Sequence, residues 1–212
     1  MGREFLDIFE EWADSYDETV EGHDIQYKEV FRGYESILTK VTERSEGTVW
    51  EFGSGTGNLT IKLLKKGLEV IGIEPSKEMR AIFTKKLGDS IQITDGDFLS
   101  YNIEKKPDTI VSTYAFHHLT DDEKALAFQQ YSNVLSKGGK IVFADTIYES
   151  TEAYKAGIKD AKDQGFTDLA ADLIREHYTT IPALTKMAEA AGFNVTFTKC
   201  NSFVWLMEAI KQ

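Results

Sequence analysis

The feature that most constrains this chain is a regular alternation between short β-prone segments and longer segments with helical periodicity. The alternation occupies residues 47–145. Units of this kind connect parallel strands through right-handed crossovers, so they predict an α/β, doubly wound, mostly parallel sheet with helices on both faces. Strands are expected over residues 48–52, 69–73, 91–94, 109–113 and 140–144, and helices over 59–66, 77–87 and 120–135.

Both ends of the chain depart from this alternation. Apolar residues recur at helical spacing near the N-terminus, and two short β-prone segments joined by a turn close the chain. A C-terminal antiparallel hairpin can add to a parallel sheet, which would bring the sheet to seven strands. Helices are expected over 5–16, 30–41, 151–178 (irregular) and 182–192, and the hairpin strands over 194–199 and 203–208.

The charge balance disfavours some classes of partner. The 212 residues include 24 basic and 35 acidic ones, a formal net charge of −11. Nucleic acids and anionic membranes call for a basic surface. Cys200 is the only cysteine, so no intramolecular disulfide can form, which suits a reducing cytoplasm. We expect a cytoplasmic, single-domain protein that binds neither nucleic acid nor membranes; its oligomeric state is not indicated.

A glycine-rich loop joins the first strand of the alternation to its first helix. The loop reads E-F-G-S-G-T-G-N over residues 51–58, with Gly53, Gly55 and Gly57 letting the backbone turn tightly and a ligand approach closely. The third glycine comes one position earlier than in the dinucleotide fingerprint G-x-G-x-x-G. Glu51 would repel a pyrophosphate and attract an ammonium group. The loop therefore favours S-adenosylmethionine (SAM), which carries an α-ammonium and no phosphate, over NAD.

Acidic residues follow the next two strands. Glu74 closes the second strand and could accept hydrogen bonds from both hydroxyls of a ribose. A solvated acid at a strand end is the alternative, but the glycine loop upstream favours the ribose role. Asp97 follows the third strand and could accept a hydrogen bond from an adenine amino group, with Asp95 as the competing choice. Phe98 could pack beside the adenine ring or offer its backbone N–H to a ring nitrogen.

In these motifs the chain resembles the class I SAM-dependent methyltransferase family, of the small-molecule type, and looks closest to bacterial members whose acceptors are unassigned. The shared stretches are E-x-G-x-G-x-G after the first strand, G-D-F at 96–98, S-T-Y-A-F-H-H-L at 112–119, L-S-K-G-G-K at 135–140 and F-E-E-W-A-D-S-Y-D at 9–17. The family often has Asp where this chain has Glu51, so the ammonium contact here could pass through water. The resemblance implies a Rossmann-like fold and a methyl acceptor that the sequence does not name.

The resemblance also implies a division of the single domain, 1–212, into three parts. Residues 1–46 would form a helical cap over the cofactor, in which Tyr16 acts as a lid; a core aromatic is the alternative. Residues 47–145 would bind SAM, with Tyr114 in the segment that borders the sulfur and the acceptor. Residues 146–212 would form the acceptor cover and the terminal hairpin.

His117 and His118 are the candidates for a general base, which is needed only if the acceptor loses a proton. Histidines at such a junction can also simply cap or pack. The four histidines (His23, His117, His118, His177) lack metal-ligand spacing, so no metal site is expected. Two alternatives to a methyltransferase are a nicotinamide-dependent oxidoreductase with a variant loop and a non-catalytic SAM-binding regulatory protein.

Overall fold

The computed structural model describes residue 20 and residues 24–212. The helix expected over 5–16, and Tyr16 with it, lies outside the described residues. The strands are β1 (Thr48–Phe52), β2 (Glu69–Ile73), β3 (Gln92–Thr94), β4 (Thr109–Thr113), β5 (Lys140–Tyr148), β6 (Thr179–Thr180), β7 (Phe193–Lys199) and β8 (Val204–Lys211). The helices are α3 (Tyr34–Arg44), α4 (Asn58–Lys65), α5 (Lys77–Leu87), α6 (Asp121–Val134), α7 (Thr151–Asp163), α8 (Thr167–Arg175) and α9 (Ile181–Ala190), with a 3-10 turn, η1 (Phe116–His118), before α6.

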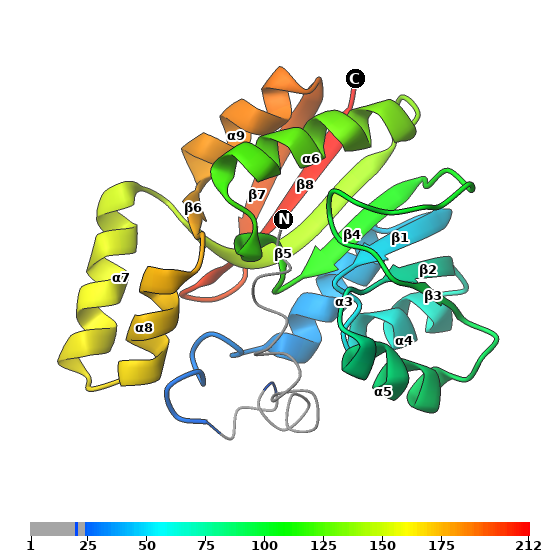
Figure 1. Cartoon of the computed structure of the whole chain (residues 1–212). Coiled ribbons are helices and arrows are strands. Elements are labelled where there is room, and N and C mark those ends of the chain that lie inside the picture. Colours follow the sequence, from blue (N-terminus) through cyan, green and yellow to red (C-terminus); the bar gives the residue numbers. More distant parts are fainter. Residues whose placement is uncertain (1–19, 21–23) are drawn as a thin grey trace.

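The eight strands of the described residues form one sheet: seven lie in the order β3-β2-β1-β4-β5-β8-β7, and the short β6 pairs with β5 off this path (Figure 1). Strands β1 to β5 pair in parallel, whereas β8 pairs antiparallel with both β5 and β7. The doubly wound, mostly parallel sheet of seven strands with a C-terminal antiparallel hairpin is therefore confirmed. The order reverses between β1 and β4, and in such sheets ligands bind at the carboxyl ends of the strands beside this switch point.

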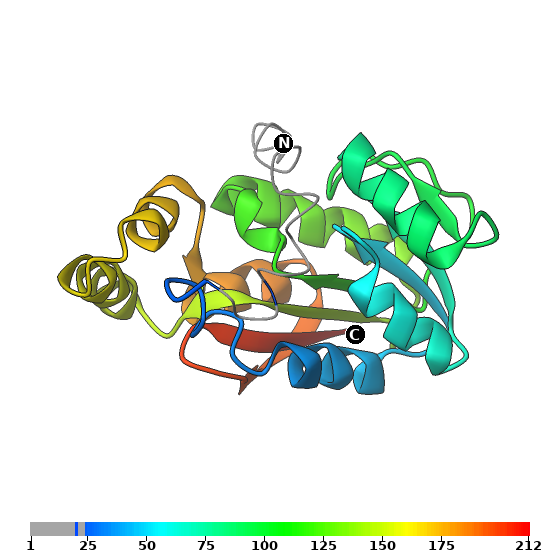
Figure 2. The same cartoon turned by 90° about the horizontal axis from the view of Figure 1, so that it is seen from below.

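Helices cover both faces of the sheet, and the alternation of side chains along each strand divides the core between them. Val49 of β1 packs in the cluster that holds the apolar residues of α3 and α4. Trp50 and Phe52 point to the other face, where they pack with residues of α6 and α9. Figure 2 shows α3 and α6 on opposite sides of the sheet.

Three regions of the chain differ most from expectation. Strand β5 extends to Tyr148 rather than ending at residue 144, because β8 pairs with it as far as Thr146 and the two-residue strand β6 pairs with Ile147 and Tyr148. A strand as short as β6 leaves no pattern in the sequence. Helix α3 begins at Tyr34, after Gly33 in the left-handed region at φ 78°.

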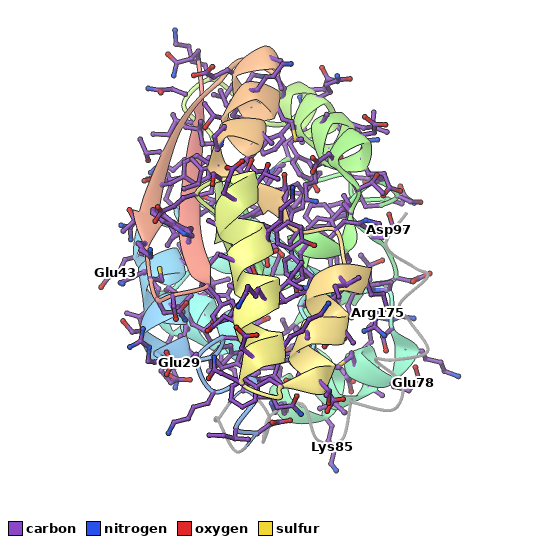
Figure 3. The ribbon with its side chains drawn as sticks, turned by 90° about the vertical axis from the view of Figure 1, so that its left-hand side faces the viewer. Glu29, Glu43, Glu78, Lys85, Asp97 and Arg175 are labelled. Carbon is purple, nitrogen blue, oxygen red and sulfur yellow. The ribbon has the colours of Figure 1, made fainter. Side chains whose placement is uncertain are left out.

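The third difference is the region expected to be irregular and helical, which is a pair of helices, α7 and α8. They pack on each other beyond the carboxyl end of β5 (Figure 1). When the side that carries α7 and α8 faces the viewer, both helices lie in front of the sheet, and Arg175 lies at the C-terminal end of α8 (Figure 3). Among the described residues, none of the helices has the length and apolar character needed to cross a membrane.

Candidate functional site

A cavity opens at the carboxyl ends of β1, β2 and β4, beside the switch point of the sheet. It brings together the glycine loop, the turn after β2, the turn after β3 and the segment after β4. Of the predicted cofactor residues that the structure describes, all but Glu51 and Gly57 line it. The lining residues are Gly53, Gly55, Glu74, Pro75, Met79, Asp97, Phe98, Thr113, Tyr114, Ala115 and His118.

The glycines of the loop have different structural roles. Gly53, at φ 64°, lies so close to the segment after β4 that an added Cβ would come within 2.8 Å of the Ala115 Cβ. Gly55, at φ 53°, faces open space on the side where a Cβ would stand. Gly57 is the N-cap of α4, and a Cβ there would come within 2.7 Å of Leu87 Cδ1 on α5. Gly53 and Gly55 thus border the cavity, whereas Gly57 serves the packing of α4 against α5.

Glu74 presents a buried carboxylate to the cavity. Its Oε2 accepts a hydrogen bond from the Gly55 N–H at 2.9 Å, and its Oε1 accepts one from the Ser76 N–H at 2.9 Å. Burial raises the pKa of this carboxyl, and the two N–H donors and Arg80 oppose that shift. Each carboxylate oxygen can accept more than one hydrogen bond. The group is therefore fixed in place with capacity for a pair of ligand hydroxyls.

Glu51 points away from the cavity. It lies on the same side of β1 as Val49, toward α4, where its Oε2 accepts a hydrogen bond from Thr60 Oγ1 at 2.6 Å. Burial raises the pKa of Glu51 to about 8. The carboxyl is thus mostly protonated at neutral pH, beneath the glycine loop rather than in the wall of the cavity.

The turn after β3 holds Asp97 at the cavity and Phe98 mainly in the core. Asp97 Oδ1 accepts hydrogen bonds from the backbone N–H groups of Leu99 at 3.0 Å and Ser100 at 2.9 Å, which fixes the turn. The Phe98 ring stacks on Phe52 with centroids 5.3 Å apart, and its side chain is buried. Its backbone is therefore the part best suited to meet a ligand. Asp95 is not among the cavity-lining residues and pairs with Arg80 at 3.2 Å.

Tyr114 combines a strained backbone with a place in the cavity wall. At φ 55° it is the one residue other than glycine with positive φ in the described part of the chain. Such conformations cost about 1–3 kcal/mol and gather at functional sites. The ring packs against Phe31 at 5.1 Å and Tyr34 at 5.7 Å, so Tyr114 links the end of β4 to the segment before α3 and to the first residue of α3.

The two adjacent histidines of η1 have different environments. His118 is buried and lines the cavity. Burial lowers its pKa well below the usual value, and the neighbouring His117, Arg175 and Lys124 lower it further, so the imidazole is neutral at neutral pH. A neutral imidazole can accept a proton.

His117 instead lies between two carboxylates. Its Nδ1 is 2.6 Å from Asp145 Oδ1, and its Nε2 is 3.4 Å from Glu176 Oε2. Burial lowers the pKa of His117, but Asp145 and Glu176 outweigh burial, so the net shift is upward. The pKa of His117 is therefore shifted in the opposite direction from that of His118.

Sequence reasoning missed Asp145 and Glu176. Asp145 lies in the middle of the apolar strand I-V-F-A-D-T-I-Y, and an acid in such a strand is a signal that could have singled it out. Glu176 follows α8, and no local pattern connects it with His117.

One ligand atom from each of His117, His118 and Glu176 lies within 4.8 Å of the others, close enough to consider a metal ion. Contacts with Asp145 and Glu176 already engage both ring nitrogens of His117, so these residues do not require a metal ion. The absence of a metal site stays a prediction.

Comparisons with known proteins bear on the family and the fold of the chain. Residues 49–139 match a family described as a methyltransferase domain. An uncharacterized methyltransferase of Anoxybacillus flavithermus is 62% identical over 213 residues, covering 100% of both chains, and one of Bacillus cereus is 58% identical over 212 residues, again covering 100% of both. Among solved structures, magnesium protoporphyrin IX methyltransferase from Synechocystis with bound S-adenosylhomocysteine (SAH) superposes with a TM-score of 0.73 at 16% identity, covering 100% of this chain and 99% of that chain.

Proposed function

This chain belongs to the class I SAM-dependent methyltransferase family, and we propose that it transfers the methyl group of SAM to a small-molecule acceptor beside η1. The observation that carries the proposal is the Glu74 carboxylate, buried at the end of β2 and held by two backbone N–H groups. That is the position from which a ribose can be held by both hydroxyls. The similar Synechocystis methyltransferase was solved with SAH bound, which agrees with a nucleoside ligand in a fold of this kind.

In this proposal the remaining cavity residues each hold one part of SAM. Asp97 accepts a hydrogen bond from the adenine amino group, and the Phe98 backbone meets the ring. Gly53 and Gly55 let the cofactor approach the loop closely. Tyr114 borders the sulfur and the acceptor. These roles are supported by the place of the residues in the cavity wall.

Glu51, Gly57 and Tyr16 take less direct roles. Glu51 is buried beneath the loop, so it would stabilise the α-ammonium through an intermediate group rather than by contact. Gly57 would support the cofactor site by letting α4 pack on α5. Tyr16 would act as a lid from the cap that residues 1–46 contribute, a role that lies outside the described residues.

The sulfonium of SAM already activates the methyl group, so the protein must mainly align the acceptor with the sulfur–methyl bond. When bound, SAM would supply the methyl group: the acceptor atom, whether oxygen, nitrogen, sulfur or carbon, would form a bond to the methyl carbon as the carbon–sulfur bond breaks, and that electron pair would stay on sulfur. An acceptor that carries a proton gives it to His118, whose neutral imidazole lines the cavity. His117, already engaged by two carboxylates, is the weaker candidate for the base.

The acceptor is expected to be a small molecule covered by α7 and α8, since these helices interrupt the regular alternation beyond the end of β5. The net charge of −11 disfavours a nucleic acid, and the single cysteine suits the cytoplasm. Neither a nicotinamide-dependent oxidoreductase nor a non-catalytic protein gains support from the relatives, which carry the name methyltransferase.

Calorimetric titration with SAM, SAH and NAD tests the proposal on the wild type and on Glu74→Ala. Loss of one or two ribose hydrogen bonds should weaken SAM binding about 10- to 100-fold. The matched control is Glu69→Ala, since Glu69 lies at the opposite end of β2 and pairs with Lys105 at the surface. The control should bind SAM as the wild type does. Binding of NAD without binding of SAM would overturn the proposal.

A further inference from the structure

The turn η1 is held in place mainly by groups outside itself. A single 3-10 turn of three residues contributes few hydrogen bonds of its own. Here the His118 N–H donates to the Ala115 carbonyl at 3.2 Å, and the Leu119 N–H donates to the Phe116 carbonyl at 3.2 Å. The position of His118 in the cavity wall must therefore depend on contacts that fix the turn from other elements.

Asp145 of β5 supplies the strongest of these contacts. It is 3% exposed, and its two oxygens hold both the ring and the backbone of His117. Oδ1 lies 2.6 Å from His117 Nδ1, while Oδ2 accepts a hydrogen bond from the His117 backbone N–H at 2.9 Å. A buried carboxylate is costly unless it is fully paired, so this arrangement strongly favours one position of the turn.

Residues 176–178, which follow α8 and belong to the region assigned to the acceptor cover, also contact His117 of the turn. Glu176 Oε2 lies 3.4 Å from His117 Nε2 and accepts a hydrogen bond from the Tyr178 hydroxyl at 2.5 Å. The Tyr178 ring stacks on the His117 ring with centroids 4.9 Å apart. The His177 N–H donates to the His117 carbonyl at 3.0 Å, so both the backbone and the side chains of this segment contact His117.

A buried lysine connects the segment that follows α8 to the end of η1 by hydrogen bonds. Lys124 of α6 donates from Nζ to the carbonyl of Leu119 and to that of His177 at 2.5 Å. The turn therefore lies between β5, α6 and the segment that follows α8, with His117 at the centre of the contacts.

From this geometry we propose that Asp145 and Glu176 are positioning residues that act through His117 to hold His118 at the cofactor cavity. The rings of His117 and His118 have centroids only 4.2 Å apart, so whatever fixes His117 also fixes the orientation and the surroundings of His118. The inference rests on the proposed function, because the position of His118 matters for catalysis only if the cavity holds a methyl donor.

The arrangement also has an electrostatic consequence. The titratable and charged groups that face the histidine pair are Asp145, Glu176, Lys124, Arg175 and His177. The two carboxylates favour the cationic form of His117, and a cationic His117 favours the neutral form of its neighbour. Removing one carboxylate should therefore lower the pKa of His117 and raise the pKa of His118.

The test is an NMR pH titration of isotope-labelled histidines in the full chain, with each signal assigned by its own His→Gln substitution. Asp145→Asn and Glu176→Gln are compared with Glu149→Gln, which removes a surface acid paired with Lys199. In Asp145→Asn we expect the His117 pKa to fall and the His118 pKa to rise, with the same directions in Glu176→Gln and no change in Glu149→Gln. SAM titrations of the same samples report on the cofactor site.

Wild-type titration curves for both histidines in Asp145→Asn and Glu176→Gln would overturn the inference. So would shifts of the same sign for the two residues. If Asp145→Asn does not fold, Glu176→Gln decides alone. Failure of the wild type to bind SAM would instead contradict the proposed function. The histidine titrations would show separately whether the two carboxylates control the pKa of His118.

Discussion

Glu74 and His117 show how differently the two sides of the site are built. Glu74 finds its partners nearby in the chain, at Ser76 and at Gly55, 2 and 19 residues away. His117 pairs with Asp145, 28 residues away, and with Glu176, further still along the chain. The side proposed to hold the cofactor is thus made of turns that local motifs specify, whereas the side proposed to hold the acceptor depends on contacts between elements that only the complete fold brings together. Three predictions test this difference.

The largest effect is expected on the acceptor side. Replacing His118 by Ala should lower the rate of methyl transfer about 100- to 10,000-fold, the usual range for loss of a general base, while the dissociation constant for SAM changes little. Because burial and the nearby positive charges depress the His118 pKa, wild-type activity should stay level from neutral pH upward and fall only in acid. Steady-state rates against pH, with SAM affinity from calorimetry, provide the check.

His177→Ala is the matched control for that variant, since His177 holds the turn through its backbone N–H and carbonyl, which the substitution keeps. It should keep most of the activity. Equal turnover by the wild type and by His118→Ala would contradict a general-base role for His118 and leave it as a residue that only lines the cavity.

A smaller effect is expected from the glycine loop on the cofactor side. Gly53→Ala places a methyl group 2.8 Å from the Ala115 Cβ in a left-handed conformation, so strain of about 1–2 kcal/mol and overpacking of about 1–3 kcal/mol add, and the free energy of unfolding should fall by about 2–5 kcal/mol. Gly55→Ala meets open space, so only the conformational strain of about 1–2 kcal/mol remains. Urea denaturation of both variants gives the comparison. A Gly55→Ala protein less stable than Gly53→Ala would show that close approach to Ala115 is not what requires glycine.

The smallest effect concerns Glu51. With a pKa raised to about 8, its carboxyl holds a proton at pH 7, and a bound α-ammonium would favour the charged form. Binding of SAM at pH 7 should therefore release up to about one proton, seen as a dependence of the calorimetric heat on the ionisation enthalpy of the buffer. The dependence should vanish in Glu51→Gln. A wild-type heat that is the same in every buffer would mean that Glu51 does not respond to the ammonium.

The same carboxyl makes stability depend on pH in an unusual direction. Its folded pKa of about 8 lies above the ordinary value of 4.5, so the folded chain binds more protons than the unfolded chain between these values. The contribution of Glu51 to stability is therefore present below about pH 4.5 and is lost as the pH rises toward 8.

Much of the fold could be predicted because its signals are local. The strands β1, β2 and β4 run over the expected residues, since each is a short apolar segment bounded by turns. The extension of β5 and the strand β6 could not be predicted, because pairing with β8 and with Tyr148 creates them.

The site divides in the same way. Gly53, Gly55, Glu74 and Asp97 are found at the cavity, as their places at strand ends indicated. The direction in which Glu51 points was not apparent, because it follows from the alternation of side chains along a strand buried on both faces. Asp145 could have been singled out as an acid within an apolar strand, but nothing in the sequence connects Asp145 or Glu176 with His117.

The central claim is that the chain moves a methyl group from SAM to a small molecule. The most direct measurement incubates the wild type, Glu74→Ala and His118→Ala with methyl-labelled SAM and a bacterial extract limited to small molecules, and follows both SAH and the label. The account predicts SAH formation with label in a small-molecule product for the wild type, and far less of both in the two variants. Tight SAM binding by the wild type with no SAH and no labelled product would contradict it and favour a SAM-binding protein without catalysis.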